Sequence, residues 1–188
     1  MKKSIFCLSI VSLMGLNSYA MAADPVTPVT VNGGVVHFTG SVVDSPCVVD
    51  NDSNNATVNL GQVKTSSLAK TGNPLGAAKP FSIHLSDCAL TTYTNAAVTF
   101  TGPTVSGKTD QLAVNGGGAG SSTAGGVAIQ VLDNSGKAVS VDGSTASPAQ
   151  KLASSDNYLQ YSAQYIATSD TITAGAANAD ANFSITYN

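Results

Sequence analysis

The sequence contains no tryptophan, no arginine and no glutamate, and charged residues make up only 10% of its 188 residues. All of its positive side chains are therefore the eight lysines, which stand against eleven aspartates and leave a net charge of −3. Nucleic-acid binding depends on a basic surface, usually rich in arginine, that neutralises phosphates. The composition therefore argues against nucleic acid and against anionic membrane surfaces as partners.

The patterns that mark catalytic and metal sites are also absent. The two histidines, His37 and His84, each lie in the middle of a strand-like run, where a structural or solvent-facing role is expected. The chain has no G-x-S-x-G elbow and no H-E-x-x-H helix. Its cysteines and histidines lack the spacing of a metal site, and its aspartates are spread over turns. We therefore expect neither an enzyme nor a bound cofactor or metal.

The first 22 residues have the pattern of a secretory signal peptide. Lys2 and Lys3 form a basic start, and residues 4–16 are an apolar run that is shorter than the roughly 20 residues of a membrane-spanning helix. Small residues then offer two cleavage sites, after Ala20 or after Ala22. We predict that the chain is exported, that residues 1–22 are removed, and that nothing in the chain inserts into a membrane.

Cleavage after Ala22 leaves 166 residues, with six lysines against eleven aspartates and a net charge of −5. That length suits one domain with a sizeable core. Cys7 is removed with the signal, so Cys47 and Cys88 remain, and an exported chain meets an oxidising environment. We predict a disulfide between them, which closes a loop of about 40 residues and stabilises the fold by roughly 4 kcal/mol.

The mature chain alternates short apolar runs with turns rich in Gly, Asn and Ser. Such a pattern, with no long helix, predicts an all-β sandwich in a single domain. A short helical turn is expected within residues 61–70, and residues 115–126 are expected to be a flexible glycine-rich loop. The predicted strands are residues 31–47, 56–60, 79–88, 96–101, 111–114, 127–132, 137–141, 158–167 and 180–188.

Residues 31–47 read as a strand in an unusual place, directly after the export signal. Alternate positions share one face of an extended chain, and the opposite face is mostly polar. A strand that is apolar on one side needs a sheet to enter, and its two glycines indicate close backbone approach. The residues on the apolar face are Gly34, Val36, Phe38, Gly40 and Val42.

The end of the chain is apolar on alternate residues as well, through Phe183, Ile185 and Tyr187. Chain termini normally fray unless they are tied down. Two interpretations remain open. The run is the last strand of the sandwich, or it is a strand held by another protein that captures the terminal carboxylate.

Several segments together resemble the major subunit, or pilin, of type 1 fimbriae assembled by the chaperone–usher pathway. The family's glycine near the C-terminus and its penultimate aromatic residue fall on Gly175 and Tyr187. The resemblance covers essentially the whole mature chain. It is carried by VNGGVVHFTGSVVDSPCVVD (31–50), LGQVKTSSLAKTG (60–72), FSIHLSDC (81–88), GVAIQVLD (126–133) and GAANADANFSITYN (175–188).

The resemblance implies an incomplete immunoglobulin-like β-sandwich that lacks its last strand, formed by residues 43–188. Residues 23–42 would be an N-terminal extension that supplies the strand to a neighbouring subunit, with Gly40 facing the pocket that accepts only glycine. The implied partners are related subunits in a head-to-tail polymer, a periplasmic chaperone and an outer-membrane usher. The implied location is a fimbria on a Gram-negative cell. The alternative is a minor or adaptor subunit, or a single-domain adhesin that binds a host receptor.

Overall fold

In the computed structural model, residues 27–65, 70–117 and 122–188 are described, and the predicted signal peptide therefore lies outside the described residues. The chain divides into a unit that ends at Ser41 and a unit formed by Val42–Asn188. The larger unit is almost entirely β-structure. Its elements are β1 (Val48–Val49), α1 (Asn51–Asn54), β2 (Pro74–Ser86), β3 (Asn95–Thr101), β4 (Leu112–Ala113), β5 (Val127–Leu132), β6 (Gln150–Lys151), β7 (Asn157–Ala167) and β8 (Asn182–Tyr187).

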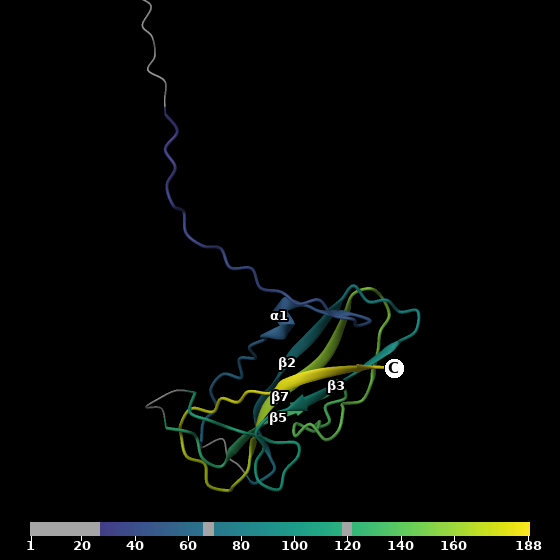
Figure 1. The fold of residues 1–188 in the computed structure, drawn as a ribbon. Helices are drawn as coiled ribbons and strands as arrows, with labels where there is room; N and C mark the ends of the chain where they lie inside the picture. Colours follow the sequence, from purple (N-terminus) through teal and green to yellow (C-terminus); the bar gives the residue numbers. More distant parts are fainter. Residues whose placement is uncertain (1–26, 66–69, 118–121) are drawn as a thin grey trace, which may run out of the picture. The chain divides into compact units, whose positions relative to one another are not determined.

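The strands form two antiparallel sheets (Figure 1). One sheet has the order β1-β2-β7-β5-β4 and the other has the order β6-β3-β8. The longest strands of the first sheet are β2 and β7, and their register aligns Ile83 with Leu159. In the second sheet β3 pairs with β8 from Thr101↔Asn182 to Ala96↔Tyr187. The strand order places the C-terminal strand β8 at a sheet edge, beside β3.

The core lies between the two sheets. Leu85, Leu159 and Val98 are its largest fully buried side chains, and all six residues of β5 are buried. A buried hydroxyl pair joins the sheets, because Ser147 Oγ lies 2.8 Å from Tyr161 Oη and accepts a 3.1 Å hydrogen bond from the backbone N–H of Val98. Burial raises the pKa of the Tyr161 phenol, so it stays neutral in the core.

The helix lies in an unexpected place. α1 falls within residues 50–55, DNDSNN, a cluster of Asp and Asn that is typical of a turn. The side chain of Asp50 accepts a 3.2 Å hydrogen bond from the N–H of Asp52 and caps the first helical turn. The helical turn predicted in residues 61–70 falls partly outside the described residues. Its described portion, residues 61–65, contains no helix.

The glycine-rich segment 115–126 is not the free loop that the sequence predicts, at least in its described residues. Its backbone pairs with residues 173–178: Gly125 and Thr173 exchange two hydrogen bonds of 3.2 and 3.1 Å, and Asn115 and Asn178 exchange two of 2.7 and 3.1 Å. Composition misled the prediction because backbone pairing needs no apolar side chain. The segment therefore braces the stretch of chain that precedes β8.

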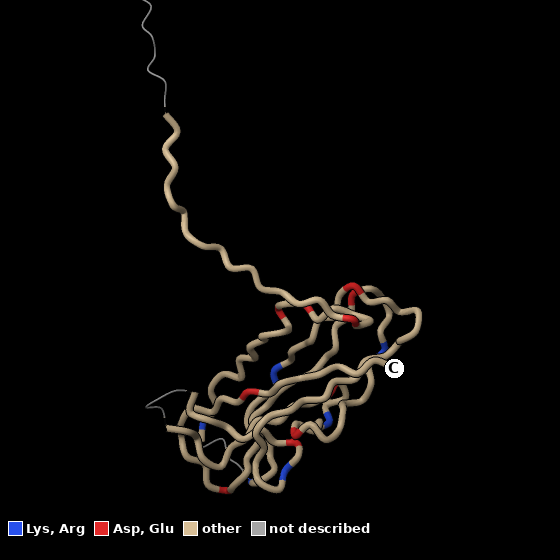
Figure 2. Tube along the Cα trace, viewed as in Figure 1, with Lys and Arg blue, Asp and Glu red and all other residues tan. Residues whose placement is uncertain are grey.

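Residues 27–41, the described part of the smaller unit, have no regular secondary structure and are exposed throughout. They carry no Lys, Arg, Asp or Glu, as the uniformly tan tube shows (Figure 2). None of residues 31–47 lies in a strand, so the strand predicted there is not formed within the described part of the chain. Among the described residues no helix is long and apolar enough to cross a membrane.

The core predicts a sharp contrast between two neighbours in β7. Replacing Leu159, which is 1% exposed, by alanine leaves a cavity and should lower the free energy of unfolding by about 2–5 kcal/mol. Gln160→Ala, at an exposed position, should change it by less than about 0.5 kcal/mol. Chemical unfolding of both variants measures the difference, and equal losses would contradict this assignment of the core.

Candidate functional site

A groove opens on the core beside β8. Its first part, about 480 Å³ in volume, lies between residues 53–60 on one side and residues 179–183 on the other. A second part, about 410 Å³, lies between residues 61–65 and residues 172–178. The flanking segments are consecutive along the chain. We call the two parts together the edge groove.

The floor of the edge groove is the hydrophobic core itself. Side chains of the core line the first part, so an occupant of the groove would contact the core directly. They come from strands of both sheets. The floor residues are Phe81, Ile83, Phe100, Leu112, Ile129, Val131 and Ala163.

One wall of the edge groove leads into β8, whose first residues, Asn182 and Phe183, line the groove. Within the described residues β8 pairs with β3 and with no other strand. The backbone N–H and C=O groups on its other side therefore lack ladder partners, which makes that edge a template for pairing with another chain. Phe183, Ile185 and Tyr187 are half-buried and pack on the core, while Asn182, Ser184 and Thr186 are exposed.

The C-terminal residue is held within its own domain. The backbone C=O of Asn188 accepts hydrogen bonds of 3.1 and 2.9 Å from the N–H groups of Thr94 and Asn95. Burial raises the pKa of the Tyr187 phenol, and the Ser45 side chain acts in the opposite direction. The structure therefore shows the run as an edge strand of the sandwich with one free edge, and capture of the chain end by another protein stays a prediction.

The opposite wall, residues 53–65, contains no strand, so the strand predicted at residues 56–60 is wrong. Val58 and Leu60 are half-buried and pack against the core, as the alternating pattern suggests. No described strand lies beside them to complete a ladder, and without hydrogen bonds the apolar alternation alone does not make a strand. Among the described residues, neither wall of the groove thus has a strand in the groove to form backbone hydrogen bonds with.

Gly175 lies in the second part of the edge groove, where two backbone segments nearly touch. A Cβ built on it would lie 2.5 Å from Ala124 N and from Ser122 O. Two hydrogen bonds of 2.8 Å, from Ala124 N–H to Ala176 C=O and from Ala176 N–H to Ser122 C=O, hold the segments together. Only glycine fits such an approach without displacing the wall.

Of the five residues predicted to form the apolar face of 31–47, none lies in a strand. Val36, Phe38 and Val42 are exposed, Phe38 to 91%. Gly34 has a φ of +113°, outside the strand region, and Gly40 has open space around it. The structure therefore leaves this face unpaired within the chain.

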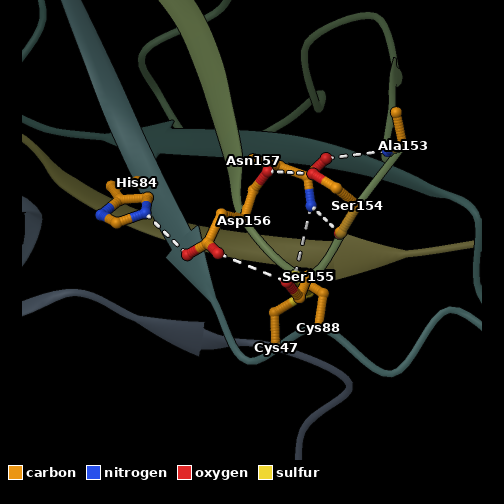
Figure 3. Close-up of a disulfide and its surroundings, with 8 residues drawn as sticks. All are labelled: Cys47, His84, Cys88, Ala153, Ser154, Ser155, Asp156 and Asn157. Carbon is orange, nitrogen blue, oxygen red and sulfur yellow. Dashed lines mark hydrogen bonds and ion pairs between the residues drawn. A yellow bond between two sulfur atoms is a disulfide. The ribbon is translucent and has the colours of Figure 1, made fainter.

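The predicted disulfide is confirmed: Cys47 is bonded to Cys88, 41 residues further on (Figure 3). It joins the start of β1 to the end of β2, and Cys47 is 1% exposed. Asn157 braces the same place, with its side-chain N–H donating to Ser154 C=O at 2.7 Å and its Oδ1 accepting from Ala153 N–H at 2.8 Å. The bridge secures β1, which is only two residues long.

His84 lies near the disulfide, and its imidazole contacts two aspartates and a tyrosine. Its Nδ1 is 3.3 Å from Asp50 Oδ2 and its Nε2 is 3.4 Å from Asp156 Oδ1. The second contact does not have the geometry of a hydrogen bond. The ring of Tyr158 stacks on the imidazole with centroids 4.3 Å apart. His84 thus links three segments of the chain, and no group of metal ligands is found among the described residues.

The disulfide predicts the behaviour of Cys88→Ser. Loss of the cross-link should cost about 2–5 kcal/mol of stability and reduce recovery of the subunit from an oxidising compartment. Thermal unfolding and periplasmic yield measure the effect, and Cys47→Ser should match it. Unchanged yield and unfolding temperature would argue against a structural bridge.

The close approach at Gly175 predicts that Gly175→Ala displaces the groove wall. Overpacking against backbone should lower the free energy of unfolding by about 1–3 kcal/mol. Gly33→Ala is the control, since a Cβ on Gly33 meets nothing within 4 Å. Chemical unfolding compares the two variants, and an equally mild effect at both positions would contradict the tight contact.

Comparison with known proteins agrees with this geometry. The family model described as "Fimbrial protein" matches residues 36–188. The type-1 fimbrial protein A chain of Escherichia coli is 42% identical over 188 residues, covering all of both chains. The fimbrial subunit type 1 of Salmonella typhimurium is 42% identical over 187 residues, again covering all of both.

Solved structures show the same fold. A chaperone–usher pilus, whose structure concerns the molecular basis of rod uncoiling, aligns with a TM-score of 0.69 and 32% identity over 86% of this chain and 99% of its own. The P pilus rod subunit PapA aligns with a TM-score of 0.64 and 31% identity over 77% of this chain and all of its own. The fold is therefore an incomplete immunoglobulin-like sandwich, and the chain belongs to the fimbrial protein family.

Proposed function

We propose that this chain is a structural subunit of an adhesive fimbria on a Gram-negative cell, and that it polymerises head to tail by donor-strand exchange. The observation that carries the proposal is the free edge of β8 beside a groove floored by core residues. A strand added there pairs with β8 and covers the floor. Strand addition of this kind is a recurring mode of recognition, and chaperone–pilin complementation is one of its named examples.

The segment best suited to fill the groove is residues 23–42 of another copy or of a related subunit. Its apolar face of Gly34, Val36, Phe38, Gly40 and Val42 suits an apolar floor, and residues 27–41 bring no Lys, Arg, Asp or Glu that would be costly to bury. Residues 31–42, twelve in number, extend to roughly 40 Å. Each groove wall, residues 53–65 and residues 172–183, contains a similar number of residues to this segment.

Such an interface joins two different surfaces of the subunit, the extension of one and the groove of the next. A heterologous contact that does not close into a ring generates a filament. The extension and the folded domain thus have separate roles, and we place the boundary between Val42 and Val43. In this function the subunit is not an enzyme and needs no cofactor.

Before polymerisation the open groove is an aggregation hazard, because it combines a strand edge with apolar surface. A periplasmic chaperone that lends a strand to the groove removes the hazard, and an outer-membrane usher then exchanges it for a subunit. We assign the chaperone contact to Gly175, Phe183, Ile185 and Tyr187: Gly175 and Phe183 line the groove, and the other two lie further along β8.

The proposal predicts that deleting residues 23–40 abolishes fibres while leaving a soluble, chaperone-bound subunit, because the deletion removes the donor strand and keeps the groove. Electron microscopy of cells that express the variant with a matching chaperone and usher tests this. Normal fibres from the deleted chain would refute donor-strand polymerisation.

A pair of point variants tests the register within the same prediction. Phe38→Asp puts a charge on the apolar face and should prevent assembly, since an unpaired buried carboxylate is costly. His37→Asp puts the same charge on the opposite face and should assemble. Neither residue belongs to the unit formed by Val42–Asn188, so unfolding of that domain should be unchanged in both.

A further inference from the structure

Asn32 is followed by a glycine in a part of the chain that offers no protection to either residue. Both are exposed and lie outside regular secondary structure. A Cβ on Gly33 or on Gly34 would meet nothing within 4 Å. Among the described residues, no hydrogen bond involves the backbone of residues 32–34. The side-chain amide of Asn32 and the N–H of Gly33 are thus free to approach each other.

We propose that Asn32 is a site of spontaneous deamidation. The backbone nitrogen of Gly33 loses its proton and attacks Cγ of Asn32, and the new N–Cγ bond closes a five-membered succinimide. The bond from Cγ to the amide nitrogen breaks, and that nitrogen leaves as ammonia. Water then opens the ring at either carbonyl and yields aspartate or isoaspartate. One water is consumed, one ammonia is released, and no oxidant or reductant takes part.

The chain contains a matched comparison at Asn115, which also precedes a glycine. There the backbone is fixed on both sides, because Asn115 and Asn178 exchange two hydrogen bonds of 2.7 and 3.1 Å. The side-chain Oδ1 of Asn115 accepts a 2.9 Å hydrogen bond from the N–H of Gly117. These contacts hold the side-chain carbonyl of Asn115 on the N–H of Gly117 and resist the rotation that ring closure requires.

The consequence for assembly rests on the proposed function. Asn32 has the same parity as Gly34 and Val36, so in an extended strand it points toward the groove. Aspartate there brings a negative charge to the groove, and isoaspartate lengthens the backbone and shifts the strand register. A donor strand held in a neighbour's groove is hydrogen-bonded and extended, which blocks the attack. Deamidation therefore accumulates in subunits that wait unassembled and lowers their ability to join the fibre.

The test compares mature full-length subunit from the periplasm with assembled fibres, both incubated at mildly alkaline pH and analysed by peptide mass spectrometry. In the soluble subunit Asn32 should deamidate at least about tenfold faster than Asn115, a difference of roughly 1.4 kcal/mol in activation free energy. Gly33→Ala should slow the reaction at Asn32 and leave Asn115 unchanged. Equal rates at the two asparagines in soluble subunit would overturn the proposed site.

The fibre sample separates the two proposals. Protection of Asn32 in fibres supports both, whereas rapid deamidation there as well would leave the site standing and count against the donor strand. Asn32→Asp mimics the product and Asn32→Ser is its uncharged control. Fewer or shorter fibres with Asn32→Asp alone support the effect on assembly, and equal fibres with both variants would overturn it.

Discussion

The unpaired edge of β8 is the constraint on which the rest of this molecule depends. A strand at a sheet edge beside a groove lined by core residues is a liability for any protein. On the opposite wall, residues 53–65 also pair with no strand among the described residues. The two walls and the apolar floor define the shape and chemistry of one occupant, an extended and uncharged segment that is apolar on one face.

A domain that lacks a strand must still hold together until the strand arrives. The disulfide secures the two-residue strand β1 to the end of β2, and the hydroxyl pair of Ser147 and Tyr161 joins the two sheets inside the core. Their contribution does not depend on the groove being filled. The domain therefore keeps its shape while part of its apolar surface remains available to a partner.

Prediction from the sequence succeeded where local pattern and tertiary context agree. β5 was predicted residue for residue, because residues 127–132 form a short apolar run bounded by turns and are buried on both faces. The disulfide followed from cysteine count and export alone. The strand predicted at 56–60 failed because alternation records burial and says nothing of a hydrogen-bonding neighbour. The bracing of residues 115–126 was missed because backbone pairing between glycine-rich segments leaves no apolar pattern.

The groove wall that precedes β8 is held by close backbone packing. A Cβ on Gly175 would collide with residues 122–124, and a Cβ on Gly102 would lie 2.7 Å from Asp180 O. Because neither glycine has a side chain, a neighbouring backbone segment can approach closely at both positions. A wall fixed in this way loses little conformational freedom when a strand is added, and such preorganisation favours binding. Glycine thus has two opposite roles in this chain. Gly33 and Gly34 are unconstrained in the extension, whereas Gly102 and Gly175 allow close backbone packing at the groove wall that receives a donor strand.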